Sequence, residues 1–338
     1  MREDGVRRPE DISIALAANH RYASGLKATL ASMVLSAKDK SRLRFHVLAD
    51  GLEPEDEREL AALARGLGLT RAIEFHRPDM TPVRARFQPY RGAHTAFLRL
   101  FLCDFLEEDW VIYADVDTLW FRDVADLWKE RDGTASVQWS RDVPWVARGV
   151  KEYSRPWFPD FDESKYACSG VMLMNLRRMR ATRFVDRCAA FVERWGTPPF
   201  VDQDIMAYVC RADAKLLDQR WDCMMPDRQA PRGVVLHFNG LGARFDEPFA
   251  GWRPQYAIWY RFYYDWVKGT PDRAVCSPFK RLVFALLGLF YPSRAVLRIL
   301  FGWRGLETVD QLHRQLFFAW LRLRMGALLP RSPRDFPL

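Results

Sequence analysis

The sequence has 338 residues, of which 49% are hydrophobic and 14% aromatic, and its net charge is +8. This apolar content excludes a natively disordered chain, and the length suffices for one large core or for one domain with an appendage. Residues 272–338 contain eleven Arg or Lys and four Asp or Glu, so the rest of the chain is almost neutral. The basic character therefore belongs to the C-terminal part and does not indicate a nucleic-acid-binding body.

The cysteines and the N-terminus indicate a reducing compartment. The six cysteines form no CxxC pair, and most lie in apolar surroundings, as reduced core thiols do. The first residues, MREDGVRRPEDIS, lack the apolar segment of a secretory signal, and no Asn-x-Ser/Thr site occurs. No apolar run reaches the roughly 18 to 20 residues that a bilayer span needs. We expect a cytoplasmic protein, with the inner face of the cytoplasmic membrane as a further location.

Short apolar runs alternate with helical patterns as far as about residue 240. The runs that predict buried strands are ISIALAA (12–18), RFHVLAD (44–50), RAIEFH (71–76), WVIYAD (110–115), TASVQW (134–139), SGVMLMNL (169–176), AKLLD (214–218) and VVLHFN (234–239). The patterns that predict helices cover 22–37, 53–69, 94–106 and 183–196. This alternation predicts an α/β domain with a largely parallel sheet. Loops rich in proline and aromatic residues are expected at 141–163 and 245–256, either as flaps over a site or as surface connections.

The character of the chain changes after residue 270. Residues 279–303 are apolar with scattered arginines, and from Val309 apolar residues recur at helical spacing with arginines beside them. We therefore expect two parts, a catalytic domain over 1–270 and a basic amphipathic helical tail over 271–338. Such segments can lie in a membrane interface. The alternative is that the tail packs on the main domain or on a partner.

Several nucleotide-binding and hydrolytic fingerprints are missing. The sequence contains no GxGxxG after its first strand, no GxxxxGK[ST], no HExxH and no GxSxG. A nicotinamide-binding Rossmann domain, a P-loop enzyme, a zincin-type protease and a GxSxG hydrolase are therefore unsupported.

Asp115 and Asp117 interrupt the apolar run VIYADVDTLWFRDV (111–124) where the predicted strand ends. In α/β sheets, ligands collect at the carboxyl ends of the strands, and His237 stands at another such end. Two carboxylates at a turn can hold a hard divalent cation such as Mn²⁺ or Mg²⁺. Taken alone, such a pair more often marks a solvated turn than a metal site, so the assignment depends on the rest of the chain.

The order of several motifs resembles glycosyltransferase family 8, a retaining family of the GT-A fold that includes bacterial lipopolysaccharide galactosyl- and glucosyltransferases and glycogenin. The resemblance covers roughly residues 11–262. It rests on the DxD motif and on IALAANHRYASGLKATLASM (14–33), HTAFLRLFLCDFL (94–106), CSGVMLMNLRRMR (168–180), VDQDIMAYV (201–209) and LHFNGLGAR (236–244). It implies a GT-A nucleotide-diphospho-sugar transferase fold, with a mixed, mostly parallel sheet flanked by helices and a C-terminal helical extension.

The resemblance also implies a set of ligand-binding residues. Asp115, Asp117 and His237 would hold Mn²⁺, or Mg²⁺, against the diphosphate of a UDP-sugar, where the metal acts as a Lewis acid toward the leaving UDP. Asp117 and His237 would be the firmer ligands, while Asp115 would also touch the ribose in such a site. The remaining positions that would bind the donor are Ala17, Asn19, Tyr22, Arg99, Ser169, Gly170, Gly240 and Arg244.

Three further residues correspond to the family's catalytic centre. Gln203 and its neighbour Asp202 would lie near the anomeric carbon, and Asp142 would bind sugar hydroxyls. A neutral Gln is too weak to be a strong nucleophile, which favours a same-face substitution with retention, in which the leaving phosphate helps to deprotonate the acceptor. The expected reaction transfers galactose or glucose from a UDP-hexose to an oligosaccharide, a lipopolysaccharide or a lipid-linked acceptor. The basic tail would supply a peripheral membrane contact.

Two departures from the family pattern leave an alternative open. The family usually has Asp at the position of Asn19, and Lys at the position of Ala243, where Arg244 follows and could supply the cation. These departures motivate a catalytically silent relative that binds sugar nucleotides or glycans. A phosphohydrolase or nucleotidyltransferase is a second rival, but a nucleotidyltransferase would show a Gly-rich loop where this chain has AANHRYASGL.

Overall fold

The structure is a computed structural model that describes residues 10–90, 93–224 and 234–239, together with 259, 262, 263, 266 and 267. The described residues up to His237 belong to one compact unit, and a second unit begins at Phe238. The boundary expected at residue 270 and the tail over 271–338 lie outside the described residues, so both stay predictions.

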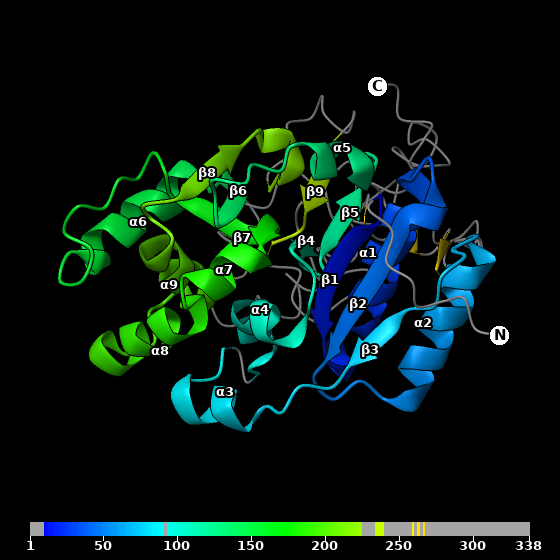
Figure 1. Ribbon diagram of the computed structural model, residues 1–338, viewed down its shortest axis with the longest axis horizontal. Helices are drawn as coiled ribbons and strands as arrows, with labels where there is room; N and C mark the ends of the chain where they lie inside the picture. The colour runs from blue at the N-terminus through cyan, green and yellow to red at the C-terminus, as the bar shows by residue number, and fades with distance from the viewer. Residues whose placement is uncertain are drawn as a thin grey trace, which may run out of the picture. The chain divides into compact units, whose positions relative to one another are not determined.

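A seven-stranded mixed sheet forms the centre of the compact unit, with the strand order β3-β2-β1-β4-β7-β6-β8 (Figure 1). The neighbours β3, β2, β1 and β4 run parallel, β7 is antiparallel to both β4 and β6, and β8 is parallel to β6. The predicted α/β class and the mixed, mostly parallel sheet are confirmed. The strands are β1 (Ile12–Ala18), β2 (Leu43–Ala49), β3 (Glu74–His76), β4 (Trp110–Ala114), β5 (Thr118–Trp120), β6 (Val137–Arg141), β7 (Ala167–Asn175), β8 (Ala214–Leu217) and β9 (Val235–His237).

Helices cover both faces of the sheet, because alternate side chains of each strand point to opposite sides. The core on one face contains residues of α1, α2 and α5 and strand residues such as Ile14 and Ile112. The core on the other face contains residues of α4, α6, α7, α8 and α9 and strand residues such as Ala15 and Tyr113. The helices are α1 (Ala23–Ser36), α2 (Pro54–Gly66), α3 (Thr81–Arg86), α4 (Leu102–Phe105), α5 (Val124–Lys129), α6 (Pro144–Ser154), α7 (Leu176–Ala181), α8 (Phe184–Trp195) and α9 (Val201–Val209), and the 3-10 helices are η1 (His20–Tyr22), η2 (Lys40–Arg42), η3 (Thr95–Phe101) and η4 (Gln219–Trp221).

The predicted elements differ from the observed ones at several places, and the helices α3, α5, α7 and α9 were not predicted. The helix expected over 94–106 is η3 followed by the single turn α4, and the loop expected over 141–163 contains α6. The short strand β5 was not predicted. The strand with His237, β9, pairs with β5 in a separate two-stranded sheet instead of joining the main sheet.

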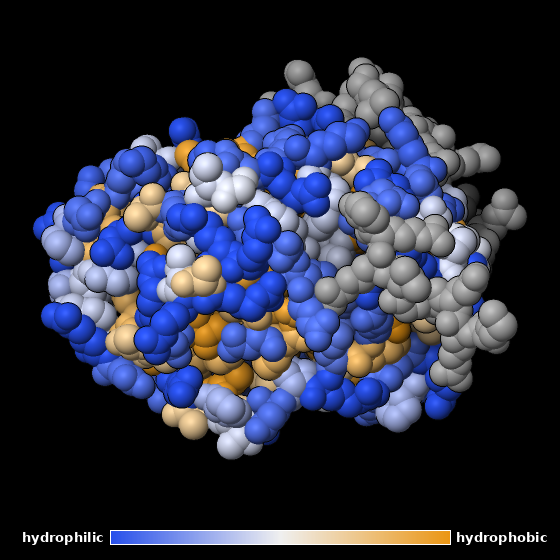
Figure 2. Space-filling model, in the orientation of Figure 1, coloured by the Kyte–Doolittle hydropathy of each residue, from blue (hydrophilic) through white to orange (hydrophobic). Residues whose placement is uncertain are grey.

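The length and hydropathy of the helices bear on a membrane span within the described residues. None of the helices assigned there is long and apolar enough to cross a bilayer. Figure 2 shows a face that is mostly hydrophilic, with hydrophobic residues gathered in the area of α3, α4 and α8.

Candidate active site

A tight turn between β4 and β5 carries Asp115 and Asp117. Thr118 Oγ1 donates to the Asp115 carbonyl oxygen at 2.8 Å, and Thr29 Oγ1 of α1 donates to the Thr118 carbonyl oxygen at 2.8 Å. The apolar residues on either side, Ala114 and Leu119, are completely buried. The turn is therefore held by the core on both sides, and its two carboxylates stay partly accessible at the edge of the sheet.

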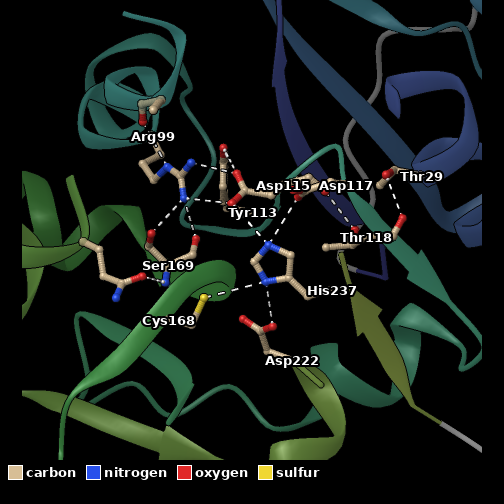
Figure 3. A network of polar contacts seen from close by, with 12 residues as sticks. Thr29, Arg99, Tyr113, Asp115, Asp117, Thr118, Cys168, Ser169, Asp222 and His237 are labelled. Atoms are coloured by element: carbon tan, nitrogen blue, oxygen red, sulfur yellow. Dashed lines mark hydrogen bonds and ion pairs between the residues drawn. The ribbon is translucent and has the colours of Figure 1, made fainter. Parts of the chain in front are cut away.

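His237 is brought to this turn by the pairing of β5 with β9, in which Thr118 lies opposite His237. Its Nε2 atom is 3.2 Å from Asp117 Oδ1 and 4.0 Å from Asp115 Oδ2. Figure 3 shows the imidazole ring between the two aspartates on one side and Asp222 on the other. The residues predicted as metal ligands thus converge, although His237 reaches the site from a different sheet.

Asp222 and Cys168 contact the opposite nitrogen of the same ring. Asp222 Oδ1 lies 2.9 Å and Cys168 Sγ 3.7 Å from His237 Nδ1 (Figure 3). Because a carboxylate only accepts, Nδ1 carries a proton toward Asp222, which leaves Nε2 as the nitrogen that faces the aspartate pair. Burial raises the pKa of the Cys168 thiol, so this group stays protonated and is a poor metal ligand.

Gly170, on β7, makes room for the ring of His237. A Cβ atom at this position would lie 2.2 Å from His237 Cε1 and 2.6 Å from Nδ1, which is far inside contact distance. The residue needs no unusual backbone angle, so the requirement is for space. Gly170 therefore lies in the site as predicted, and its role in this structure is to allow the approach of His237.

Arg99 is a buried residue of η3, and its side chain connects η3 to the sheet through hydrogen bonds. Its guanidinium donates to Asp115 Oδ1 at 2.7 Å and to the carbonyl oxygen of Ser169 at 2.7 Å (Figure 3). Its Nε atom lies 3.1 Å from Asp202 Oδ2. The guanidinium also lies over the ring of Tyr113, 4.5 Å from the centroid. These contacts let Arg99 position Asp115, and its predicted contact with the donor stays a prediction.

The charges of the aspartate and histidine side chains depend on one another. Burial raises the pKa of Asp115 in spite of Arg99, while His237 and its hydrogen bond hold the pKa of Asp117 below its usual range against the effect of burial. Burial lowers the pKa of His237, but the carboxylates of Asp222 and Asp117 more than offset this and raise it well above its ordinary value. The two carboxylates therefore stabilise a proton on His237, and a protonated Nε2 can donate to Asp117.

Hydrogen bonds to both the nitrogen and the oxygen of its amide hold the Gln203 side chain in place. Its Nε2 atom donates to Asp142 Oδ2 at 2.7 Å and to Tyr166 Oη at 2.8 Å, and its Oε1 atom accepts from Ser169 N at 3.1 Å. Tyr166 in turn donates to Asp204 Oδ1 at 2.7 Å. The predicted catalytic residues Gln203 and Asp142 therefore form one network.

Asp202 joins this network to Arg99. It accepts from Ser169 Oγ at 3.0 Å, and burial raises its pKa to about 6, against the effect of Arg99. The residue before it, Val201, has a φ of 35°, which is strained for a β-branched side chain. Such strain collects at functional sites, where the surrounding structure enforces it. The start of α9 is thus fixed in an unfavourable conformation that presents Asp202 and Gln203.

Asn19 follows β1 and is held by a chain of hydrogen bonds. Asn19 Nδ2 donates to Thr95 Oγ1 at 3.1 Å, and Thr95 Oγ1 donates to Asp50 Oδ2 at 2.7 Å. Because Asp50 only accepts, this chain fixes the amide orientation. Asn19 Oδ1 is buried and has no hydrogen-bond partner among the residues that the structure describes.

Ala17 and Tyr22 lie close to Asn19 in the chain, as predicted for the opening segment. Ala17 is the penultimate residue of β1 and follows Leu16, which pairs with Ala114 directly before Asp115. Tyr22 ends η1 and packs against the core that includes α1. The register of β1 and β4 thus brings this segment to the sheet edge that carries the aspartate turn.

Several residues of the site were missed by sequence reasoning. Asp222 and Tyr166 lie outside any motif, and Tyr113 was treated as an apolar strand residue although its hydroxyl donates to Asp115 Oδ1 at 2.9 Å. Asp204 lies in the motif VDQDIMAYV (201–209), but no role was predicted for it. Gly240 and Arg244 lie outside the described residues, so their predicted roles stay predictions.

The candidate ligand atoms suit a hard divalent cation. Asp115, Asp117 and His237 each offer one ligand atom, and these atoms lie within 4.8 Å of one another. Two carboxylates and one imidazole nitrogen are ligands that Mn²⁺ accepts, and Mg²⁺ prefers the carboxylates. The carboxylate behind His237 is the partner that metal-bound histidines usually have.

Comparisons with known proteins agree with this geometry. The model of the family described as Glycosyl transferase family 8 matches residues 13–241. Glucoside xylosyltransferase 2 of Mus musculus is 33% identical over 148 residues, which are 42% of this chain and 33% of the relative. A probable galacturonosyltransferase-like 9 of Arabidopsis thaliana is 24% identical over 282 residues, 70% of this chain and 68% of the relative. The chain spans about a third of the length of the first of these relatives.

Solved structures share the fold. The galactosyltransferase LgtC, in complex with donor and acceptor sugar analogues, aligns with a TM-score of 0.62 at 22% identity, over 75% of this chain and 95% of that chain. The bifunctional glycosyltransferase WbbM aligns with a TM-score of 0.62 at 18% identity, over 80% of this chain and 52% of that chain. Mouse xyloside xylosyltransferase 1 aligns with a TM-score of 0.54 at 18% identity, over 68% and 98%. These likenesses confirm the GT-A architecture.

Proposed function

The chain belongs to glycosyltransferase family 8, and from this premise we propose that it is a metal-dependent, retaining hexosyltransferase that uses a UDP-sugar as donor. The observation that carries the proposal is the convergence of Asp115, Asp117 and His237 beside the Gln203 network. Galactose or glucose is the proposed sugar. The names of the curated relatives make xylose and galacturonic acid the competitors that a test must include.

The aspartates and His237 would hold Mn²⁺ or Mg²⁺. When bound, the cation supplies Lewis acidity at the diphosphate, which stabilises the charge on the leaving UDP. Asp117 has the freer carboxylate, because both oxygens of Asp115 lie within 3.4 Å of Arg99. His237 would lose its Nε2 proton when this atom binds the cation, so the affinity for the metal should rise with pH.

The unpaired Oδ1 of Asn19 supports a uracil base. The N3–H group of uracil is a donor, and Asn19 Oδ1 is a buried acceptor without a partner among the described residues. Cytosine has a bare N3 at this position and would leave the acceptor unsatisfied. Asn19 can therefore replace the usual Asp of the family, because both residues present an acceptor oxygen.

The proposed step replaces UDP by the acceptor on the same face of the sugar. The bond between the anomeric carbon and the β-phosphate oxygen breaks, a bond from that carbon to the acceptor oxygen forms, and the acceptor proton passes to the departing diphosphate oxygen. Gln203 is held beside the reacting carbon by Asp142, Tyr166 and Ser169, where its amide oxygen can face the developing positive charge. Asp142 and Asp202 would accept from sugar hydroxyls.

The acceptor and the membrane contact are proposals that rest on the basic tail. We propose an oligosaccharide, lipopolysaccharide or lipid-linked acceptor and a peripheral contact through residues 279–338, whose arginines suit anionic lipids. Deleting these residues should release the protein from anionic vesicles and leave donor hydrolysis largely intact. Retained vesicle binding would refute the membrane role. Arg244 is proposed to contact a donor phosphate, and unchanged donor binding and turnover in Arg244→Ala would refute that role.

The alternative is a catalytically silent relative that binds sugar nucleotides or glycans. A panel of nucleotide-sugars, UDP-galactose, UDP-glucose, UDP-xylose and UDP-galacturonic acid, with and without Mn²⁺, separates the two functions through nucleotide release. The proposal predicts Mn²⁺-dependent release of UDP from a UDP-hexose, including slow hydrolysis without an acceptor. Binding without release from any donor would favour the silent relative.

A further inference from the structure

A second group of candidate metal-ligating side chains lies on β2 and on the edge strand β3, which β1 separates from β4 in the sheet. It consists of His46 on β2 and of Glu74 and His76 on β3, and the strand register pairs His46 with Glu74. The ligand atoms of the three side chains all lie within 4.8 Å of one another. None of these residues takes part in the candidate active site.

The spacing of the three ligand atoms suits a tetrahedral metal ion. His46 Nδ1 lies 3.1 Å from His76 Nε2 and 3.5 Å from Glu74 Oε2. A zinc ion with bonds of about 2.0 to 2.1 Å would separate its tetrahedral ligands by roughly 3.3 to 3.4 Å. The two observed distances bracket this value, so a cation could enter with small shifts of side chains.

Charged groups lie around the three candidate ligands. Glu108 Oε1 lies 3.5 Å from His46 Nε2, the nitrogen that does not face the group, although this nitrogen has no hydrogen-bond partner among the described residues. A carboxylate behind a metal-bound histidine fixes the ring and raises its basicity. Arg44 donates to Glu74 Oε1 at 2.6 Å and leaves Oε2 toward His46. The two carboxylates outnumber the one guanidinium, so the surroundings favour a cation.

The group is buried on one side and open on the other. His46 is 1% exposed, and the side chain of Glu74 is 43% exposed. The open side gives an entry path for the ion and a place for a water molecule as fourth ligand. The strand β3 has only three residues and lies at the edge of the sheet, where few hydrogen bonds hold it.

We propose that His46, Glu74 and His76 bind a divalent transition metal of the zinc class, which fastens the short edge strand β3 to β2. The site is separate from the aspartate turn and does not depend on the proposed transferase activity. Its function is structural, because no part of it reaches Asp115 or Gln203. An ordinary histidine pair hydrogen-bonded in a polar cluster is the competing explanation.

Metal titration in two backgrounds tests this proposal. In His237→Ala, which disables the aspartate site, we expect Zn²⁺ or Co²⁺ to bind at one site, to raise the melting temperature, and to give the visible absorption of tetrahedral Co²⁺. Adding His76→Ala should weaken binding at least about tenfold and abolish the shift in melting temperature. Adding Glu74→Gln, which keeps the shape of the side chain, should also weaken binding.

The matched control adds His20→Ala instead, which removes an exposed histidine that also lies beside carboxylates. It should leave the Zn²⁺ affinity and the Co²⁺ spectrum unchanged. Circular dichroism shows whether each variant is folded. Equal Zn²⁺ affinity with and without His76→Ala, or with and without Glu74→Gln, would overturn the proposal.

Discussion

The contact between Asp222 and His237 orients the imidazole ring in the candidate metal site. The carboxylate lies 2.9 Å from Nδ1, and both residues are buried, at 0% and 5% exposure. This contact turns Nε2 toward Asp117, 3.2 Å away. Asp222 stands 15 residues before His237 and belongs to no motif, yet it decides which nitrogen of the ring can bind a cation.

Asp222→Asn should weaken Mn²⁺ binding by about 10- to 100-fold, because an amide neither fixes the tautomer nor raises the basicity of the ring. Electron paramagnetic resonance of free Mn²⁺ measures the affinity. The control is Asp218→Asn, an exposed carboxylate that caps η4. Equal affinity in both variants would show that Asp222 has no role in the metal site.

Gly170→Ala should reduce metal-dependent turnover by about two orders of magnitude, because the new Cβ would displace His237. The ring cannot move aside without losing Asp222 or the pairing of β9. Steady-state release of UDP provides the measurement. In Gly149→Ala the new Cβ meets nothing within 4 Å, so this variant of α6 should keep its turnover and gain about 0.5 to 1 kcal/mol of stability. Similar turnover in the two variants would contradict the close approach of His237.

Tyr166→Phe should lower kcat by about tenfold and leave the donor KM nearly unchanged, since it removes one hydrogen bond that holds the Gln203 amide. Tyr153→Phe is the control, because Tyr153 donates to the same Asp204 at 2.6 Å but does not touch Gln203. Steady-state kinetics of both variants separates positioning from stability. An equal fall in kcat in the two variants would mean that Tyr166 acts only through the fold.

Asp202 should make the free energy of unfolding depend on pH. Its pKa is about 6 in the folded protein, above its ordinary value of 3.8, because burial disfavours the charged form. The stability that the bound proton contributes is complete below about pH 4 and is lost as the pH rises through about 6. The loss is on the order of 3 kcal/mol at most. Denaturant unfolding from pH 4 to 7 should therefore show wild type falling relative to Asp202→Asn, and a constant difference would contradict this.

Much of the fold follows from patterns that the sequence displays locally. The buried strands β1, β2, β4 and β7 are continuous apolar runs, and α2 begins at Pro54 with acidic residues in its first turn, so both were predicted. The strand β5 was missed because its three residues, TLW, have no period of their own. Its pairing with β9 depends on contacts that are distant in the sequence.

The residues that gather at the candidate site were predictable where a motif of the family contains them. They were not predictable where only the packing of the fold places them there. Asp117, His237, Gln203 and Gly170 lie together as expected. Asp222 and Tyr166 could not be found, because a single buried acid or tyrosine carries no local signal. Arg99 was assigned to the donor because its position matches the family. Its observed partners, Asp115 and Ser169, could only be found from the structure.

Calorimetric titration of UDP with and without Mn²⁺ measures whether Asp117 and His237 bind a cation that in turn binds UDP. Wild type should bind UDP at least about tenfold more tightly with Mn²⁺, a coupling of about 1.4 kcal/mol or more. Asp117→Asn and His237→Ala should lose this coupling, while Asp126→Asn, which changes a carboxylate on α5 away from the turn, should keep it. Undiminished coupling in Asp117→Asn and His237→Ala would contradict the account.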